Sequence, residues 1–369
     1  MQTSKKTQLG WSENQERHFA RILEGRGAPE QLYCARVIGV SRNLCRVLGE
    51  RGETTAVVPG RIYHAAESRS TLPAVGDWVV LTGVRAGPGA DPGGGTSVVQ
   101  AVLERKTRIS RKVPGEVTEE QIIAANVDAA LIVTGLDDDY NIKRIERYLT
   151  LVLDFGIDPL LVLNKVDLCA DAETRVDEVE SAAVGFPVLA VSAESGRGMQ
   201  SLRELLEPGR TYALLGSSGV GKSTILNRLL GREAQRTRTV REGDSRGRHT
   251  TTARELFVAE GGALLIDNPG MRELQLWGDE QGLIGAFDDI AALTAGCRFK
   301  DCTHMHEPGC AVREAVRDGS MASERLESYH KLQRELSYLE RKVSESGRDQ
   351  KARWKSISKQ IRKYYKQRR

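Results

Sequence analysis

The sequence predicts a multidomain protein in which a small β-barrel with an OB-fold precedes an α/β domain and a mostly helical, zinc-binding C-terminal domain. Three observations predict this fold class. Short alternating apolar runs, separated by turn residues, fill the stretch from residue 31 to residue 112. Strand-like apolar runs then alternate with helical patterns around a glycine-rich loop at residues 216–224, which predicts a parallel sheet. Three cysteines and a histidine with metal-ligand spacing follow at residues 297–310.

Length and composition bound what this protein can be. A chain of 369 residues, 40% of them apolar, has room for two or three domains with cores of their own. The N-terminus is polar, and no apolar run approaches the roughly 18 residues that span a bilayer, so we expect a cytoplasmic protein without membrane contact. Six cysteines without an export signal argue against a disulfide framework and for a metal site.

Positive charge is concentrated at the C-terminal end. Residues 341–369 carry twelve Lys or Arg and two acidic residues, a net charge of +10. Because the whole chain has a formal net charge of +4, the remaining residues carry a net charge of about −6. Apolar residues recur among these charges at helical spacing: Trp354, Ile357, Ile361 and Tyr364. We therefore expect residues 346–369 to form a basic helix or tail that meets an anionic surface, with nucleic acid favoured; a merely solvated tail is the alternative.

The first two regions differ in texture. Residues 1–30 are polar, with a helical pattern only near Glu16–Leu23, and are expected to form an N-terminal extension. Residues 31–112 contain five short runs that predict the strands of the barrel. These runs are Tyr33–Val40, Leu44–Leu48, Thr54–Pro59, Asp77–Thr82 and Ser97–Leu103. Such a barrel either binds nucleic acid or serves only as a spacer.

An α/β domain is expected over residues 113–280. An apolar run at 124–134 predicts a strand, residues 141–155 predict a helix, and Pro159–Leu163 predicts the next strand. Asn164-Lys165-Val166-Asp167 follows, at the carboxyl end of a strand, where a doubly wound sheet places its ligand contacts. Asp167 can accept hydrogen bonds from N1 and N2 of guanine, a donor pair that adenine lacks. The tetrapeptide therefore favours GTP over ATP, with an ordinary polar strand end as the alternative.

A second segment that contacts the base is predicted at Ser192 and Ala193, directly after a strand at Pro187–Val191. Small residues there let the backbone approach the base and help to hold its carbonyl. A plain strand-to-helix loop would have much the same sequence.

The phosphate-binding loop is the most specific motif. It is formed by Gly216-Ser217-Ser218-Gly219-Val220-Gly221-Lys222-Ser223-Thr224, between an apolar strand and a helix. In this pattern backbone N–H groups at the helix N-terminus cradle phosphates, Lys222 reaches the β- and γ-phosphates, and Ser223 ligates Mg²⁺. The sequence thus predicts a nucleotide bound together with Mg²⁺.

Two later segments are typical of γ-phosphate sensors. In the polar stretch around Thr250 and Thr251, a threonine, with Thr251 favoured, is expected to contact Mg²⁺. After the strand at 263–266, Asp267 would hold Mg²⁺ through water, and the N–H group of Gly270 would sense the γ-phosphate.

The usual water-orienting glutamine is absent after Gly270, where the sequence has Met271. Methionine cannot orient water. His249, beside the threonines, is therefore the candidate catalytic residue; packing within its loop or a contact with RNA is the alternative.

Cys297, Cys302, His304 and Cys310 have the spacing of a tetrahedral zinc site. Four protein ligands leave no open position, so we expect one structural Zn²⁺ in a domain at residues 281–345. Buried cysteines beside a chance histidine are the alternative.

The nucleotide motifs occur in an unusual order. The guanine-reading segments precede the phosphate loop and the two sensor segments, an order written G4-G5-G1-G2-G3. Joining the termini of an ordinary GTPase domain and reopening the chain after the second sensor would produce this order without changing the sheet. The sequence therefore indicates a circularly permuted GTPase domain.

Taken together, these features resemble the RsgA (YjeQ) family of small ribosomal subunit biogenesis GTPases. The resemblance covers about residues 30–340 and is carried by Gly-Arg-His-Thr-Thr-Thr at 247–252, the phosphate loop and the Cys-Cys-His-Cys set. It implies a GTP hydrolase, stimulated by the small (30S) subunit, that acts late in the maturation of that subunit. It also implies binding of 16S rRNA through the barrel and the zinc domain by a monomeric protein that cycles between GTP and GDP.

One residue departs from the family pattern, since Asn268 stands where the family usually has threonine. GTP binding is expected to survive, because the roles of Asp267 and Gly270 do not use that side chain. Two alternative functions remain: a GTP-dependent RNA-binding switch that is not an enzyme, and a permuted GTPase that serves the large subunit.

Overall fold

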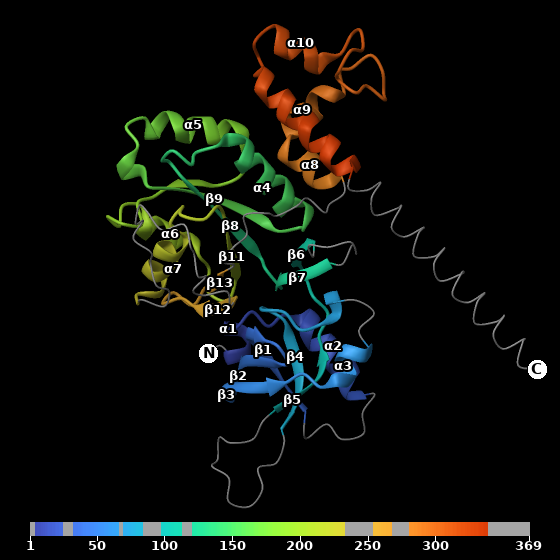
Figure 1. Ribbon diagram of the computed structural model, residues 1–369, viewed down its shortest axis with the longest axis vertical. Helices are drawn as coiled ribbons and strands as arrows, with labels where there is room; N and C mark the ends of the chain where they lie inside the picture. The colour runs from blue at the N-terminus through green and yellow to red at the C-terminus, as the bar shows by residue number, and fades with distance from the viewer. Residues whose placement is uncertain are drawn as a thin grey trace, which may run out of the picture.

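The computed structural model describes residues 4–24, 32–65, 69–83, 97–112, 120–232, 254–267 and 280–338. Three regions follow one another along the chain (Figure 1): a barrel in blue, a sheet flanked by helices in green and yellow, and a group of helices in orange and red. None of the helices within these ranges is long and apolar enough to span a bilayer.

Five strands close into the barrel: β1 (Leu32–Ser41), β2 (Leu44–Gly49), β3 (Gly52–Val57), β4 (Trp78–Gly83) and β5 (Ser97–Val102). Their order is β1-β2-β3-β5-β4, and β4 pairs back to β1 from Leu32↔Thr82 to Arg36↔Trp78. Val37, Val47 and Leu81 fill the interior and are fully buried. Helix α3 (Gly60–Ala65) and a short 3₁₀ turn (Arg69–Thr71) lie between β3 and β4. The expected five-stranded barrel is confirmed.

Residues 4–24 fold onto this barrel as helices α1 (Lys5–Gln8) and α2 (Glu13–Glu24). Leu9 and Phe19 are buried, and the ring of Trp11 packs edge-on against Trp78 with centroids 4.7 Å apart. The predicted helical pattern at 16–23 lies within α2. A helix of four residues, such as α1, is too short to show a period in the sequence.

A buried arginine joins the N-terminal helices to the rest of the molecule. Arg36 is 1% exposed and donates to the backbone carbonyls of Leu9, Gly76 and Asn126. Burial lowers the pKa of Arg36 to about 10. Because its donors are satisfied by three carbonyls from three segments, the side chain fixes how those segments meet.

The second region is a mostly parallel sheet with strand order β10-β9-β8-β11-β13-β12. Its strands are β8 (Ala129–Gly135), β9 (Asp158–Asn164), β10 (Val188–Ala190), β11 (Thr211–Leu215), β12 (Glu255–Val258) and β13 (Leu264–Asp267), of which only β12 runs antiparallel to its neighbour within this sheet. Helices α4 (Ile142–Asp154) and α5 (Ala172–Ala182) cover one face. Helices α6 (Met199–Leu205) and α7 (Lys222–Leu230) cover the other. Successive strand residues such as Leu131 and Ile132 therefore belong to the cores on opposite faces of the sheet.

The strand expected at 124–134 is wrong in one respect, because the chain forms two strands there. β7 (Glu120–Ala125) pairs with β6 (Arg108–Lys112), and β8 begins only at Ala129. Asn126, at φ 54°, makes the turn between them; its side chain accepts from the Lys106 N–H and donates to the Gly76 carbonyl. Residues on both sides of the turn are buried, so hydropathy alone cannot mark the break.

The barrel and the sheet share one hydrogen-bonded edge. β1 pairs antiparallel with β12 at Gly39↔Glu255, so the strands of both regions form a continuous eleven-stranded sheet. Arg46 of β2 adds an ion pair to Glu255.

The third region consists of α8 (Glu280–Ala286), α9 (Asp288–Thr294), α10 (Ala311–Arg317) and a helix at residues 323–338. It packs on α4, the helix that follows β8. A Cβ atom at Gly282 of α8 would lie 2.4 Å from the carbonyl oxygen of Thr150, so glycine permits this close approach. Arg325 then pairs with buried Glu146 of α4 and with Asp289 of α9.

Candidate nucleotide site and metal centre

The phosphate loop connects β11 to α7 at the carboxyl edge of the sheet. Gly216, Gly219 and Gly221 adopt φ values of 139°, 87° and 96°. A Cβ atom at Gly216 would lie 2.2 Å from the carbonyl oxygen of Val133, and one at Gly221 would lie 2.2 Å from Nδ2 of Asn164. Glycine is thus required both for backbone conformation and for contact with neighbouring strands. The loop ends at the N-terminus of α7, where N–H groups without helical partners can face an anion.

Lys222 lies over this loop. Its Nζ atom donates to the carbonyl oxygens of Gly216, at 2.8 Å, and Ser217. Ser223 and Thr224 follow in the first turn of α7. The Nζ atom of Lys222 is therefore held at the loop that the sequence pattern predicts to bind phosphate.

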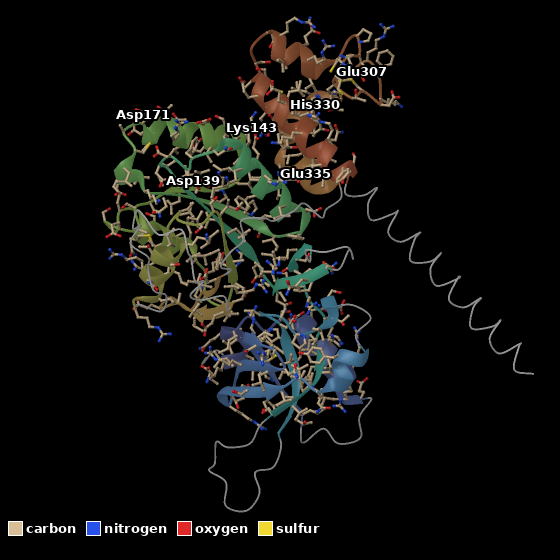
Figure 2. The ribbon with its side chains drawn as sticks, viewed as in Figure 1. Asp139, Lys143, Asp171, Glu307, His330 and Glu335 are labelled. Atoms are coloured by element: carbon tan, nitrogen blue, oxygen red, sulfur yellow. The ribbon has the colours of Figure 1, made fainter. Side chains whose placement is uncertain are left out.

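Arg144 of α4 contacts the phosphate loop, a contact that the sequence does not predict. Its Nη1 atom donates to Oγ of Ser217, at 2.6 Å, and to the carboxylate of Asp139, at 2.7 Å. Ser217 and Ser218 line a cleft of about 580 Å³ together with the first turns of α4, and Figure 2 shows Asp139 near this end of the sheet. Arg144 and Ser217 are 73 positions apart, and only the adjacency of β8 and β11 brings them together.

Asn164 connects the phosphate loop to the predicted base-reading segments. It is 3% exposed at the end of β9. Its Nδ2 atom donates to the Val220 carbonyl at 2.8 Å, and its Oδ1 atom accepts from the Ala193 N–H at 2.9 Å. One buried amide thus ties together three segments that are separate in the sequence.

The next residue, Lys165, adopts φ 67° and forms an ion pair with Asp137. Partial burial acts to raise the pKa of Asp137, but the hydrogen bond and charge of Lys165 outweigh this and hold that pKa below its ordinary value. Val166 is buried, whereas Asp167 is exposed. Within the described residues, the Asp167 carboxylate has no hydrogen-bond or ion-pair partner.

The Ser192–Ala193 segment is buried, and hydrogen bonds within its own loop hold it. Ser192 is 0% exposed, and its Oγ atom accepts from the Ser195 N–H at 3.1 Å. Its N–H group donates to the Arg197 carbonyl at 2.9 Å. This loop therefore has a defined backbone next to Asn164.

Asp267 ends β13 and is 4% exposed. Because β13 pairs in parallel with β11, at Leu214↔Asp267, its carboxylate is placed at the same sheet edge as the phosphate loop. The other predicted residues of the sensor segments, His249, Thr251 and Gly270, lie outside the described residues, as does the basic stretch 346–369.

The four predicted metal ligands come together in the third region. The donor atoms of Cys297, Cys302, His304 and Cys310 all lie within 4.8 Å of one another. The Cys297 and Cys310 sulfurs are 4.0 Å apart, and Nδ1 of His304 is 3.6 Å and 3.4 Å from them. A tetrahedral site with bonds of about 2.3 Å to sulfur and about 2.1 Å to nitrogen separates two sulfurs by about 3.8 Å, and sulfur from nitrogen by about 3.6 Å. The donor set therefore fits a tetrahedral metal ion.

Neighbouring groups hold His304 in place. Its Nε2 atom is 3.3 Å from Oγ1 of Thr294, and burial lowers the His304 pKa, which favours the neutral imidazole that binds metal. Glu307, labelled in Figure 2, accepts from the backbone N–H groups of Thr303, Met305 and His306. The hydroxyl of Thr303 donates to the same carboxylate, and this bond first, with the backbone bonds after it, lowers the pKa of Glu307.

Known proteins are similar to this chain in both sequence and fold. The family model of the RsgA GTPase matches residues 102–277. The small ribosomal subunit biogenesis GTPase RsgA of Opitutus terrae is 48% identical over 355 residues, which are 95% of each chain. The chain belongs to the RsgA family. A second RsgA protein, from Syntrophotalea carbinolica, is 45% identical over 89% of each chain.

Solved structures of RsgA relatives agree with the architecture. The crystal structure of YjeQ from Thermotoga maritima has a TM-score of 0.60 and 27% identity, covering 83% of this chain and 98% of that one. YloQ, described as a circularly permuted GTPase, has a TM-score of 0.58, covering 85% and 97%. At 23% identity, YloQ supports the fold alone. The predicted fold class, including the circular permutation, is confirmed.

Proposed function

We propose that this protein hydrolyses GTP to GDP and phosphate, and that the small ribosomal subunit stimulates this hydrolysis during its late maturation. The observation that carries the proposal is the position of Asn164, whose amide joins the phosphate loop to the Ala193 segment. Relatives of near full-length similarity are named small ribosomal subunit biogenesis GTPases. In this proposal the GTPase domain comprises residues 113–280 and the zinc-binding domain residues 281–345.

We assign the nucleotide contacts by motif. Asp167 would accept the guanine N1 and N2 donors with its exposed carboxylate, while Ser192 and Ala193 would let the backbone approach the base and help to hold its carbonyl. The phosphate loop would bind the phosphates, with Lys222 turning from the loop carbonyls to the β- and γ-phosphates. The hydrogen bonds to the carbonyls of Gly216 and Ser217 hold the Lys222 amine at the loop.

Mg²⁺ prefers oxygen ligands, and Ser223 and Asp267 offer them at the carboxyl edge of the sheet. Ser223 and Thr251 would ligate the ion through their hydroxyls, and Asp267 would hold it through water. When bound, Mg²⁺ neutralises charge on the β- and γ-phosphates. Gly270 would sense the γ-phosphate, and His249 would orient the attacking water, since Met271 cannot.

We assign the metal ion at Cys297, Cys302, His304 and Cys310 to one structural Zn²⁺. Three sulfurs and one imidazole form a ligand set that binds zinc in preference to magnesium or calcium. All four positions of a tetrahedron are taken by protein, so the ion would stabilise the fold and would not touch substrate.

Binding of 16S rRNA is assigned to the barrel, the zinc domain and the basic stretch 346–369. Beside the metal ligands, Phe299 and Met305 are exposed, and the guanidinium of Arg298 lies 5.6 Å from the Phe299 ring. An exposed aromatic ring next to a cation is suited to stacking on an unpaired base. We place the protein in the cytoplasm, acting as a monomer.

Co-sedimentation with purified ribosomal subunits tests the choice of partner. We expect the protein to pellet with small subunits in the presence of a non-hydrolysable GTP analogue, and to be released as salt rises, because phosphate contacts release counterions. Pelleting with large subunits alone would favour the alternative, a permuted GTPase that serves the large subunit.

A further inference from the structure

One arginine outside the recognised motifs contacts the backbone of the predicted base-reading loop. Arg228 lies in the last turn of α7, the helix that begins at the phosphate loop. Its Nε atom donates to the carbonyl oxygen of Ala193 at 3.0 Å, and its Nη2 atom donates to that of Glu194 at 2.6 Å. The planar guanidinium thus holds two consecutive carbonyls, 35 and 34 positions away in the sequence.

The same loop is held from its other side by Asn164. The Ala193 N–H donates to Oδ1 of Asn164, so the peptide groups before and after Ala193 are both fixed. Both holding side chains are themselves tied to the phosphate loop. Asn164 donates to the carbonyl of Val220, and Arg228 belongs to the helix that starts at Lys222. The base-reading loop is therefore connected by one side chain to the phosphate loop and by another to the helix that follows it.

We propose that Arg228 is a positioning residue for guanine recognition, which holds the backbone of Ala193 and Glu194 so that this loop meets the O6 atom of the base. This inference rests on the proposed binding of guanine nucleotides. Hydrogen bonds from a charged donor are stronger than neutral ones, and a bidentate arrangement also fixes direction. Without Arg228 the carbonyls of Ala193 and Glu194 lose the side chain that holds them, and the backbone after Ala193 can shift relative to the base while the bonds to Asn164 and within the loop remain.

A second role for Arg228 is purely structural, since a cation near a helix C-terminus is favourable by itself. The two roles differ in what they do to the base. A structural role weakens every nucleotide alike. A positioning role weakens only nucleotides that carry the O6 atom.

The test measures dissociation constants for GDP, IDP and the diphosphate of 2-aminopurine riboside. IDP lacks the 2-amino group that Asp167 would bind but keeps O6 and the N1–H group. The 2-aminopurine nucleotide keeps the 2-amino group and lacks both O6 and the N1–H group, so each nucleotide is compared between variant and wild type and not with the other nucleotides. For Arg228→Ala we expect roughly ten-fold weaker binding of both GDP and IDP. Binding of the 2-aminopurine nucleotide should barely change. Arg228→Lys, with a single ammonium group, should fall between wild type and Arg228→Ala.

Arg203→Ala is the matched control. The Arg203 guanidinium donates to the backbone carbonyl of Arg228, at the same helix end, and is not among the residues that bond to Ala193 or Glu194. The Arg203→Ala variant should bind all three nucleotides with the affinities of wild type.

Equal weakening of all three nucleotides in Arg228→Ala, or no weakening of GDP, would overturn the positioning role. A wild-type protein that binds GDP no better than ADP would instead overturn the proposed guanine specificity, and this inference with it. The two failures are distinguishable, because guanine specificity is judged from GDP against ADP on wild type, whereas the role of Arg228 is judged from the change between wild type and variant for each of the three nucleotides.

Discussion

Replacing Arg325 by methionine should loosen the C-terminal helices from α4. The Arg325 guanidinium donates to Glu146 at 2.8 Å, to both carboxylate oxygens of Asp289 and to the Ala286 carbonyl. It also lies 4.3 Å from the centroid of the Phe287 ring. Methionine can keep the apolar packing on that ring, so the change removes mainly the charge and its hydrogen bonds.

The magnitude follows from burial. Glu146 is 3% exposed, and without Arg325 its partner among these groups is the Ser328 hydroxyl. Removing one member of a buried ion pair typically costs ~3–5 kcal/mol, because the other charge remains buried and unpaired. Asp289 is more exposed and can recover water, so it adds little. A cost of ~4 kcal/mol raises the opening equilibrium of this junction by roughly 10³.

Amide hydrogen exchange of the helix at 323–338 measures that opening directly. The control is Lys143→Ala, because Lys143 and Glu327 form an ion pair across the same junction at 3.7 Å with both side chains well exposed. Such a pair is worth about 0–1 kcal/mol. Figure 2 labels Lys143 on α4, and His330 and Glu335 on the last helix. If exchange in Arg325→Met matches that in Lys143→Ala, the buried network does not hold the domains together.

Three further substitutions test the nucleotide and metal assignments. Asp167→Asn should weaken GTP binding by at least ~1.5–3 kcal/mol, because an amide presents a mismatched donor to guanine; unchanged preference for GTP over ATP in a competition assay would refute the assignment. Purified wild type should contain close to one zinc, and Cys302→Ser should lose it and increase proteolysis of the C-terminal helices while GTP binding persists; a metal-free, normally folded wild type would contradict this. His249→Ala should keep GTP affinity and subunit binding but lose on the order of 10²–10⁴ in stimulated turnover; near-normal turnover would move the catalytic role elsewhere.

Local patterns in the sequence predicted most of the architecture. The barrel strands, the phosphate loop and the Cys-Cys-His-Cys set are each encoded within a short stretch, because alternation, glycine spacing and ligand spacing are local properties. The turn at Asn126 escaped prediction, since it joins two buried strands whose residues form one apolar run.

Long-range polar contacts were beyond such reasoning. Arg144, Arg228 and Arg325 each contact residues that are distant in sequence, and nothing local distinguishes them from surface arginines. Only the order of the strands places α4 beside the phosphate loop and the end of α7 beside the base-reading loop. Hydrophobic periodicity does not specify the order of the strands in a sheet.

GTP turnover measured without ribosomes, with small subunits and with large subunits tests the central claim most directly. We predict slow turnover by the free protein, marked stimulation by small subunits, and no comparable stimulation by large subunits. Scarcely any turnover under all three conditions would favour a GTP-dependent RNA-binding switch that is not an enzyme, and stimulation by large subunits alone would contradict the proposed role in small-subunit maturation.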